Sequence, residues 1–177
     1  LIWGDDTAES ENAIERIINQ IIDPAWNNIN LSRLDGDNPS QVTQALEEAR
    51  TPPFGSGGRV VLLKKSPICN GCSNELSTKF EGISNLIPEN THLILSNTNK
   101  PDGRLKTTKT LKSLIKSNQV KEENYSLPPI WGISGQKLLV TKTAKNMNIE
   151  IDEEGILLLV EAIGNNSQRL RQELTKL

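Results

Sequence analysis

The sequence is poor in the side chains that build most catalytic and metal sites. Its 177 residues include one histidine, His92, two cysteines and one methionine. Cys69, Cys72 and His92 supply at most three ligands, whereas a closed structural zinc site needs four. A single histidine beside strand-like residues also gives no serine–histidine–acid or cysteine–histidine catalytic set. We therefore expect no metal, no cofactor and no catalytic residue.

The two cysteines form a lone Cys-Asn-Gly-Cys motif that allows two interpretations. A redox dithiol normally opens a helix after a strand, and the preceding residues 64–67 resemble the exit from a strand. Asn-Gly is also a good turn sequence, and two surface thiols in a reducing compartment need no further role. We favour the second interpretation.

Long hydrophobic runs and an excess of one charge are missing as well. The longest nearly unbroken apolar run, residues 156–160, is far too short to cross a bilayer, and the first 20 residues carry carboxylates in place of a basic signal segment. The formal net charge is -2, which gives no global reason to bind nucleic acid or an anionic membrane. These features predict a cytoplasmic protein with no membrane contact. Because the sequence starts without methionine and stops inside a helical pattern, we expect a piece of a longer protein.

One segment is locally basic. Between Lys100 and Lys116 the chain has six positive residues and a single acid, Asp102. Lys106, Lys109 and Lys112 are candidates for contact with DNA phosphates, because a basic helix face attracts them. A lysine-rich face exposed to solvent is the more common explanation of such a pattern.

Strand-like and helical patterns alternate over the first 123 residues. The runs at 59–64 and 91–97 are rich in valine, leucine and isoleucine and predict strands buried on both faces. Shorter strands are expected at 1–3, at 29–34 and from Val120, and apolar side chains recur at helical spacing in residues 7–22, 39–49, 73–87 and 105–117. This alternation is typical of a mostly parallel α/β sheet with crossover helices.

The pattern changes after Glu123. Leu127-Pro128-Pro129 is typical of a linker, and from Ile130 onward only helical patterns follow, near residues 136–146, 152–163 and 167–177, with Leu177 among the inward-facing leucines. We predict an α/β domain over residues 1–123 and a small three-helix domain over residues 124–177.

The first strand-to-helix turn lacks the features of a nucleotide site. A P-loop needs glycines that bring backbone N–H groups onto phosphate, followed by a lysine and a hydroxyl residue. Residues 4–9 read Gly-Asp-Asp-Thr-Ala-Glu, with one glycine, no lysine and three carboxylates. A polyphosphate would be repelled there, so we expect no ATP at this turn. The other glycine-rich segment, residues 55–58, precedes a strand and lacks the helix N-terminus that holds phosphate.

The second glycine-rich segment follows an unusual apolar side chain. Pro52, Pro53 and Phe54 precede Gly55, and prolines before and glycines after the ring exclude a regular helix or strand. In a chain with 3% aromatic residues, a phenylalanine on a stiff turn suits capture by a pocket on another protein. The alternative is that the ring folds back onto its own core.

The order of these features resembles the delta subunit family of the bacterial DNA polymerase III clamp loader. The resemblance rests on Leu-Ile-Trp-Gly-Asp-Asp in place of a P-loop, the Pro-Pro-Phe-Gly turn before Arg-Val-Val-Leu-Leu, Thr-His-Leu-Ile-Leu, and Pro-Asp-Gly-Arg-Leu-Lys. The closing residues 164–177, which finish in Glu-Leu-Thr-Lys-Leu, are similar to the end of that family's lid domain. The resemblance spans the whole chain.

This resemblance implies an AAA+-like parallel-sheet domain without a P-loop, a three-helix lid and a collar domain that follows them. It implies a subunit that is not catalytic itself but is part of the DNA polymerase III holoenzyme, a DNA-directed DNA polymerase. The implied partners are the sliding clamp (beta subunit), the gamma/tau and delta prime subunits, and primed DNA.

The family contacts the clamp through an apolar pair, and the matching residues here are Pro53 and Phe54, with Pro52 beside them. Many relatives carry Leu-Phe or Phe-Phe, so Pro53 departs from the pattern. The role implied is to bind the clamp and help open it during DNA replication, without binding ATP. Two alternatives stay open: an ATP-hydrolysing AAA+ or P-loop protein with a degenerate site, and a DNA-binding adaptor that uses the 100–116 basic face.

Overall fold

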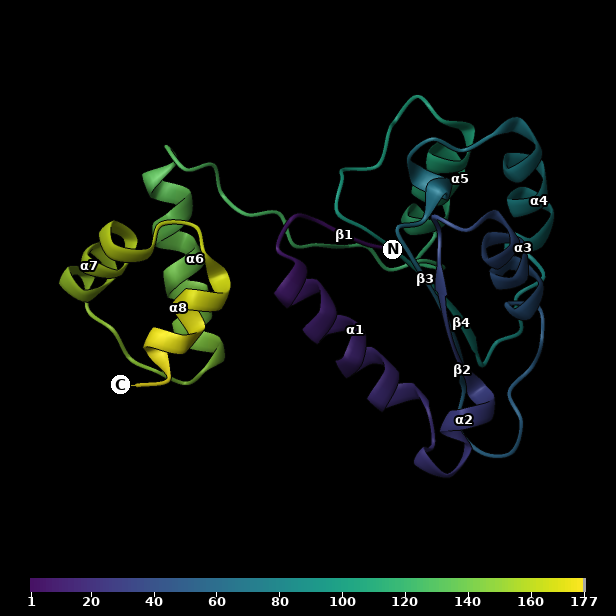
Figure 1. Ribbon diagram of the computed structural model, residues 1–177, viewed down its shortest axis with the longest axis horizontal. Coiled ribbons are helices and arrows are strands. Elements are labelled where there is room, and N and C mark those ends of the chain that lie inside the picture. Colours follow the sequence, from purple (N-terminus) through teal and green to yellow (C-terminus); the bar gives the residue numbers. More distant parts are fainter. Residues whose placement is uncertain (177) are drawn as a thin grey trace.

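A parallel β-sheet organises the N-terminal part of the chain, and three helices follow it (Figure 1). The computed structural model describes residues 1–176. The strands are β1 (Ile2–Trp3), β2 (Leu31–Asp35), β3 (Arg59–Lys64), β4 (Thr91–Asn97) and β5 (Glu123–Asn124). The helices are α1 (Thr7–Ile21), α2 (Asn27–Asn30), α3 (Pro39–Glu48), α4 (Asn74–Ser84), α5 (Lys106–Lys116), α6 (Ile133–Asn146), α7 (Glu153–Ile163) and α8 (Ser167–Leu174), with short 3-10 turns at Pro24–Trp26 and Pro67–Cys69.

The strand order is β2-β3-β4-β1-β5, and every neighbouring pair is parallel. The predicted fold class is therefore confirmed: a parallel α/β sheet followed by three helices. We call β1 to β5 with α1 to α5 the α/β unit, and α6 to α8 the helical unit.

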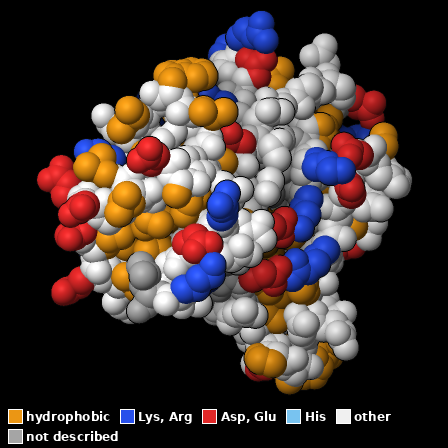
Figure 2. All heavy atoms as spheres, turned by 60° about the vertical axis from the view of Figure 1, so that its left-hand side comes forward, with side chains coloured by type: hydrophobic (Ala, Val, Ile, Leu, Met, Phe, Trp, Pro, Cys, Tyr) orange, Lys and Arg blue, Asp and Glu red, His pale blue; other side chains and the backbone are white. Residues whose placement is uncertain are grey.

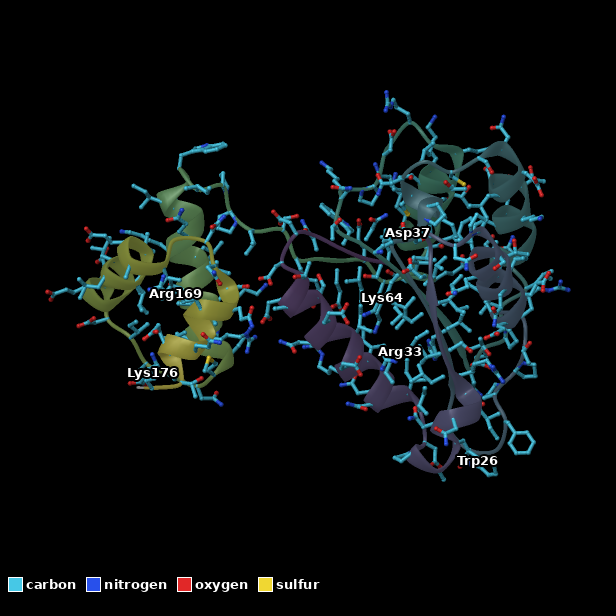
Figure 3. The ribbon with its side chains drawn as sticks, viewed as in Figure 1. Trp26, Arg33, Asp37, Lys64, Arg169 and Lys176 are labelled. Atoms are coloured by element: carbon cyan, nitrogen blue, oxygen red, sulfur yellow. The ribbon has the colours of Figure 1, made fainter. Side chains whose placement is uncertain are left out.

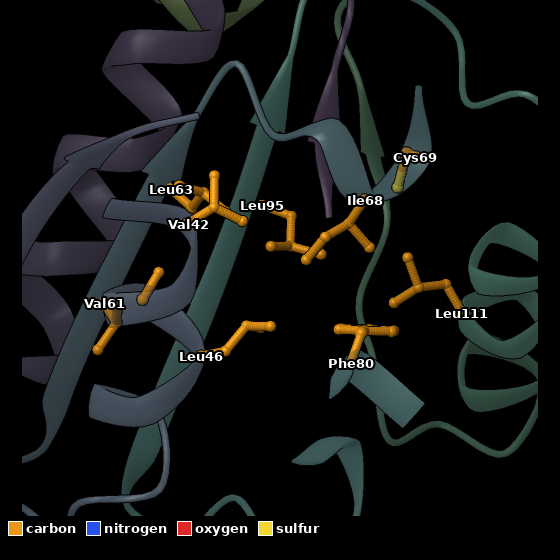
Figure 4. Close-up of a cluster of buried hydrophobic side chains, with 10 residues drawn as sticks. Val42, Leu46, Val61, Leu63, Ile68, Cys69, Phe80, Leu95 and Leu111 are labelled. Carbon is orange, nitrogen blue, oxygen red and sulfur yellow. The ribbon is translucent and has the colours of Figure 1, made fainter. Parts of the chain in front are cut away.

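Strand β3 alternates its side chains between two cores, as the period of a strand requires. On one face Val61 and Leu63 pack with side chains from α3, α4 and α5 (Figure 4). On the other face Val60 and Leu62 pack against isoleucines of α1. Both faces of the sheet are thus covered, which explains why the central residues of β3 (60–63) and β4 (93–95) are continuous apolar runs rather than alternating.

The helical unit has a core of its own. Val140 and Ala144 of α6, Val160 of α7, and Leu170 and Leu174 of α8 are all buried together. Asp152 and Asn166 cap α7 and α8 by accepting bonds from Gly155 N and Arg169 N. The predicted inward position of Leu177 lies outside the described residues.

Some element boundaries differ from expectation. The strand expected from residue 29 begins at Leu31, because residues 27–30 form one helical turn, and the last strand is Glu123–Asn124 rather than a strand that starts at Val120. Helix α4 ends at Ser84, before Pro88, and α6 begins at Ile133. Short elements of this kind are set by pairing and side-chain contacts from distant parts of the chain.

The interpretation of both cysteines as surface thiols is wrong for Cys69. Its side chain is buried in the core under α3 to α5, and burial raises the pKa of its thiol to about 11. Burial also raises the pKa of the partly exposed Cys72 thiol. Neither thiol is activated, because a reactive cysteine needs a lowered pKa.

Residues 1–176 show neither a membrane-spanning helix nor a metal-binding cluster. No helix in this range is long and apolar enough to cross a bilayer. The same residues hold no group of three or more histidine, cysteine, aspartate or glutamate side chains placed to share a metal ion.

Candidate functional site: the Pro-Pro-Phe turn

The Pro-Pro-Phe turn connects α3 to β3, at the edge of the sheet where β3 begins. The Phe54 ring is 56% exposed, Pro52 is exposed and Pro53 is half-buried. The structure therefore excludes the alternative in which Phe54 folds back into the core of the protein. An apolar ring on the surface is available to a partner.

One buried side chain, Asn30, forms hydrogen bonds with the backbone of Phe54. The Asn30 amide is fully buried; its Nδ2 donates to Phe54 O at 2.8 Å, and its Oδ1 accepts from Phe54 N at 2.8 Å. Both main-chain polar groups of residue 54 are satisfied by this single amide, so the turn does not need to rearrange to meet its hydrogen-bonding requirement.

The Phe54 ring rests on Trp26. The two ring centroids lie 4.9 Å apart with the planes at 71°, an edge-to-face contact. Gly55 follows with φ +68°, and a Cβ there would collide with the Trp26 indole. Figure 3 places Trp26 at one end of the α/β unit, on the short segment that precedes β2. The candidate site is thus a pair of aromatic rings rather than one.

The glycine-rich part of the turn is tied to the end of α1. Gly58 N donates to Ile21 O at 2.9 Å, and the Ser56 hydroxyl donates to Asp23 Oδ2 at 2.5 Å. The Ser56 hydroxyl, and then the Ala25 amide, hold the pKa of the Asp23 carboxyl below its usual value. These bonds hold the segment that carries Trp26 against the segment that carries Phe54.

Sequence reasoning found Phe54 but missed Trp26 and Asn30. Trp26 carried a weak signal, since it is one of three tryptophans and follows an Asp-Pro-Ala turn sequence. Asn30 carried none, because asparagine is common in turns and its partner lies 24 residues away. The contact depends on the sheet having already placed the two segments side by side.

The first strand-to-helix turn lies at the opposite edge of the sheet. Most of its backbone N–H groups already have partners within the chain, and linker backbone fills the space beside it. Asp6 caps α1 by accepting from Glu9 N at 3.1 Å, and Asp6 N donates to Tyr125 O at 2.9 Å. Gly4 has φ +140°, and a Cβ there would collide with the Tyr125 backbone. Residues of the linker therefore lie where a phosphate would have to approach.

A pocket of about 420 Å³ lies beside this turn, at the ends of β2, β3 and β4. Its cations are matched by carboxylates: Lys64 Nζ lies 2.7 Å from Glu11 Oε1, and Arg33 Nη1 lies 2.8 Å from Glu15 Oε1. Figure 3 shows Lys64 and Arg33 on the strands that face α1. A pocket with its charges already paired gives no strong attraction for a polyphosphate.

The three candidate lysines of the basic helix are not equivalent. Lys106 Nζ lies 2.7 Å from Glu81 Oε2 and is already paired. Lys109 and Lys112 are exposed and make no ion pair with any of residues 1–176. The structure therefore leaves two of the three lysines available to an anionic partner.

Comparison with known proteins finds a family model and solved structures that match, but no curated protein. The family model "DNA polymerase III, delta subunit" matches residues 1–123, whereas no curated protein matches the sequence. Among solved structures, the Bacillus subtilis DNA clamp loader delta protein is similar with a TM-score of 0.77 and 23% identity, over 99% of this chain and 51% of that one. The chain thus spans about half the length of that protein, and the likeness supports the fold alone. Since the family model matches well over half of its residues, the chain belongs to the DNA polymerase III delta subunit family.

Proposed function

We propose that this chain serves in a clamp loader, where it binds the sliding clamp through Pro52, Pro53 and Phe54 and helps to hold the clamp open during DNA replication. The observation that carries this proposal is the exposed Phe54 ring on a turn whose backbone is held by buried Asn30. A turn that is already ordered loses little conformational entropy on binding. Family membership supports a clamp loader as the setting, with the other loader subunits as further partners in the cytoplasm.

The expected contribution of Phe54 follows from its exposure. Full burial of a phenylalanine contributes roughly 1.5–3 kcal/mol. About half of the ring is already covered in the free chain, with 56% exposed, so a clamp pocket would gain the remaining half. That share, about 0.8–1.7 kcal/mol, corresponds to a change of about 4- to 17-fold in the dissociation constant.

The test is a titration of sliding clamp with the wild-type chain and with Phe54→Ala. We expect the variant to bind about tenfold more weakly. It should keep its fold, because the Asn30 bonds involve only main-chain atoms of residue 54. Leu158→Ala, which removes a side chain of similar exposure from α7, is the matched control and should bind like wild type. Equal affinities for Phe54→Ala and wild type would reject the proposed contact.

We also propose that the chain acts without binding ATP. Asp6 occupies the cap of α1, linker backbone fills the turn, and Lys64 is paired with Glu11 beside it. A titration with labelled ATP should show no saturable signal. Saturable binding would favour the degenerate-ATPase alternative.

The DNA-binding alternative is supported by the exposed Lys109 and Lys112. Charge reversal at both positions should abolish DNA association if this chain is a DNA-binding adaptor. If the clamp contact is the main function, we expect only a modest loss that depends on salt concentration. We further propose that residues 1–123 and 124–177 act as the AAA+-like domain and the lid domain.

A further inference from the structure

The last helix is joined to the first one by a buried hydrogen bond. Ser167, at the start of α8, donates from Oγ to Asp6 Oδ1 at 2.8 Å. Both residues are almost fully buried, Ser167 at 6% and Asp6 at 5% exposure. A buried hydrogen bond to a carboxylate is strong, and loss of either partner leaves the other unsatisfied.

A second contact lies one helical turn further along each helix. The Arg171 guanidinium of α8 forms a two-pronged ion pair with the Glu9 carboxylate of α1, in which Nη2 donates to Oε2 at 2.8 Å and Nε donates to Oε1. Both side chains are more than half covered. Such a pair fixes direction as well as distance, because the planar guanidinium matches the carboxylate at two points.

The linker between the two units is held by the same turn. Leu127 N donates to Asp5 Oδ1 at 2.7 Å, and Asp6 N donates to Tyr125 O at 2.9 Å. Residues 5–9 therefore hold both the linker and α8. Figure 1 shows α1 as the element of the α/β unit that lies beside α8.

We propose that residues Asp5 to Glu9 form an internal latch that keeps the helical unit in one orientation on the α/β unit without any ligand. A helix N-terminus attracts an anion because its first N–H groups are unpaired. Here the anions are the chain's own carboxylates, and they in turn bind Ser167 and Arg171 of the helical unit. The orientation is therefore encoded in the chain, independently of whether Phe54 binds a clamp.

The test measures the distance between the two units in the wild-type chain and in Arg171→Ala. Spin labels at the exposed positions Ser113 on α5 and Glu161 on α7, in a background with buried Cys69 replaced by alanine and Cys72 by serine, report that distance by pulsed electron resonance. We expect one narrow distance distribution in the wild type, unchanged by ATP, and a broad or two-peaked distribution in Arg171→Ala. Arg33→Ala is the matched control, because it breaks a two-pronged pair with Glu15 of the same helix α1 inside the α/β unit.

If Arg171→Ala unfolds, an exchange of the charges at residues 9 and 171 tests the latch instead. Glu9→Arg and Arg171→Glu should each broaden the distribution, and the double variant should narrow it again, since the coupling between two contacting residues is measured by such a cycle. A narrow distribution in every variant, or an ATP-dependent shift in the wild type, would overturn the latch. Neither result bears on clamp affinity, so failure here is distinguishable from failure of the clamp contact.

Discussion

Two turns of this protein carry nearly the same sequence, yet the structure supports their apolar side chains differently. Pro52-Pro53-Phe54-Gly55 precedes β3, and Pro128-Pro129-Ile130-Trp131-Gly132 precedes α6. Both expose a large apolar side chain, Phe54 at 56% and Trp131 at 85%. In both turns, one or two apolar residues stand between a pair of prolines and a glycine, and these apolar side chains are exposed.

The backbone is held in a similar way at both turns. Asn30, fully buried, binds the N–H and the carbonyl of Phe54. Gln136, 4% exposed, donates from Nε2 to Ile130 O at 2.6 Å. In each turn a buried amide side chain supplies the hydrogen bonds that an irregular backbone lacks.

The rings differ in what lies beneath them. Phe54 rests edge-to-face on Trp26, whereas Trp131 has no aromatic contact within residues 1–176. Figure 2, with the helical unit turned forward, shows hydrophobic side chains gathered on that part of the surface. Exposure alone therefore does not separate an ordered ring from a loosely held one. The aromatic contact with Trp26 separates Phe54 from Trp131.

The largest effect should come from Asn30→Ala. It removes two hydrogen bonds at once and leaves a cavity and two main-chain groups without partners, which should lower the free energy of unfolding by about 2–4 kcal/mol. Urea denaturation measures this, with the exposed Asn28→Ala of the same short helix as control. Clamp affinity should fall as well, because the turn loses its order. Stability equal to wild type would show that the grip on Phe54 contributes nothing to folding.

A smaller effect is expected from Gln136→Ala. The amide binds only carbonyl groups of its turn, one of them through a long 3.4 Å bond to Pro129 O, so the free energy of unfolding should fall by about 1–2 kcal/mol. Gln168→Ala, an exposed glutamine on α8, is the control. We expect clamp affinity to be unchanged in both variants. A weaker clamp complex in Gln136→Ala would mean that both turns face the same partner.

The smallest effect is expected from Trp131→Ala. A side chain that is 85% exposed makes few contacts, so stability should change by less than about 0.5 kcal/mol. Clamp affinity, measured in the same titration as Phe54→Ala, should equal that of wild type. A loss comparable to that of Phe54→Ala would remove the distinction between the two turns.

The long, strongly patterned elements were predictable because their physics is local. Strands β3 and β4 contain continuous apolar runs at residues 60–63 and 93–95, and α1 repeats isoleucine at helical spacing. Strands β1 and β5 have two residues each and exist through pairing: Ile2 lies between Ser96 and Glu123 in the sheet. The apolar Leu-Ile-Trp run predicted β1, whereas Glu123 and Asn124 are polar and show no strand pattern, which explains why the last strand was expected from Val120.

The candidate site likewise has one residue that the sequence could predict and two that it could not. Phe54 was predictable because prolines and glycines around a rare aromatic are visible in the sequence. Trp26 and Asn30 were not, since each meets residue 54 only after the sheet has formed. The burial of Cys69 was missed for the same reason, as its cover comes from helices elsewhere in the chain.

The grip of Asn30 on main-chain atoms has an evolutionary consequence. Because the amide binds only the N–H and carbonyl of residue 54, the hydrogen bonds that shape the turn do not depend on which side chain stands there, although the contact with Trp26 does. Leucine, methionine or tyrosine could replace phenylalanine on the same scaffold at little cost to folding. Single substitutions at residue 54 can therefore change the affinity for a partner without changing the fold of the turn.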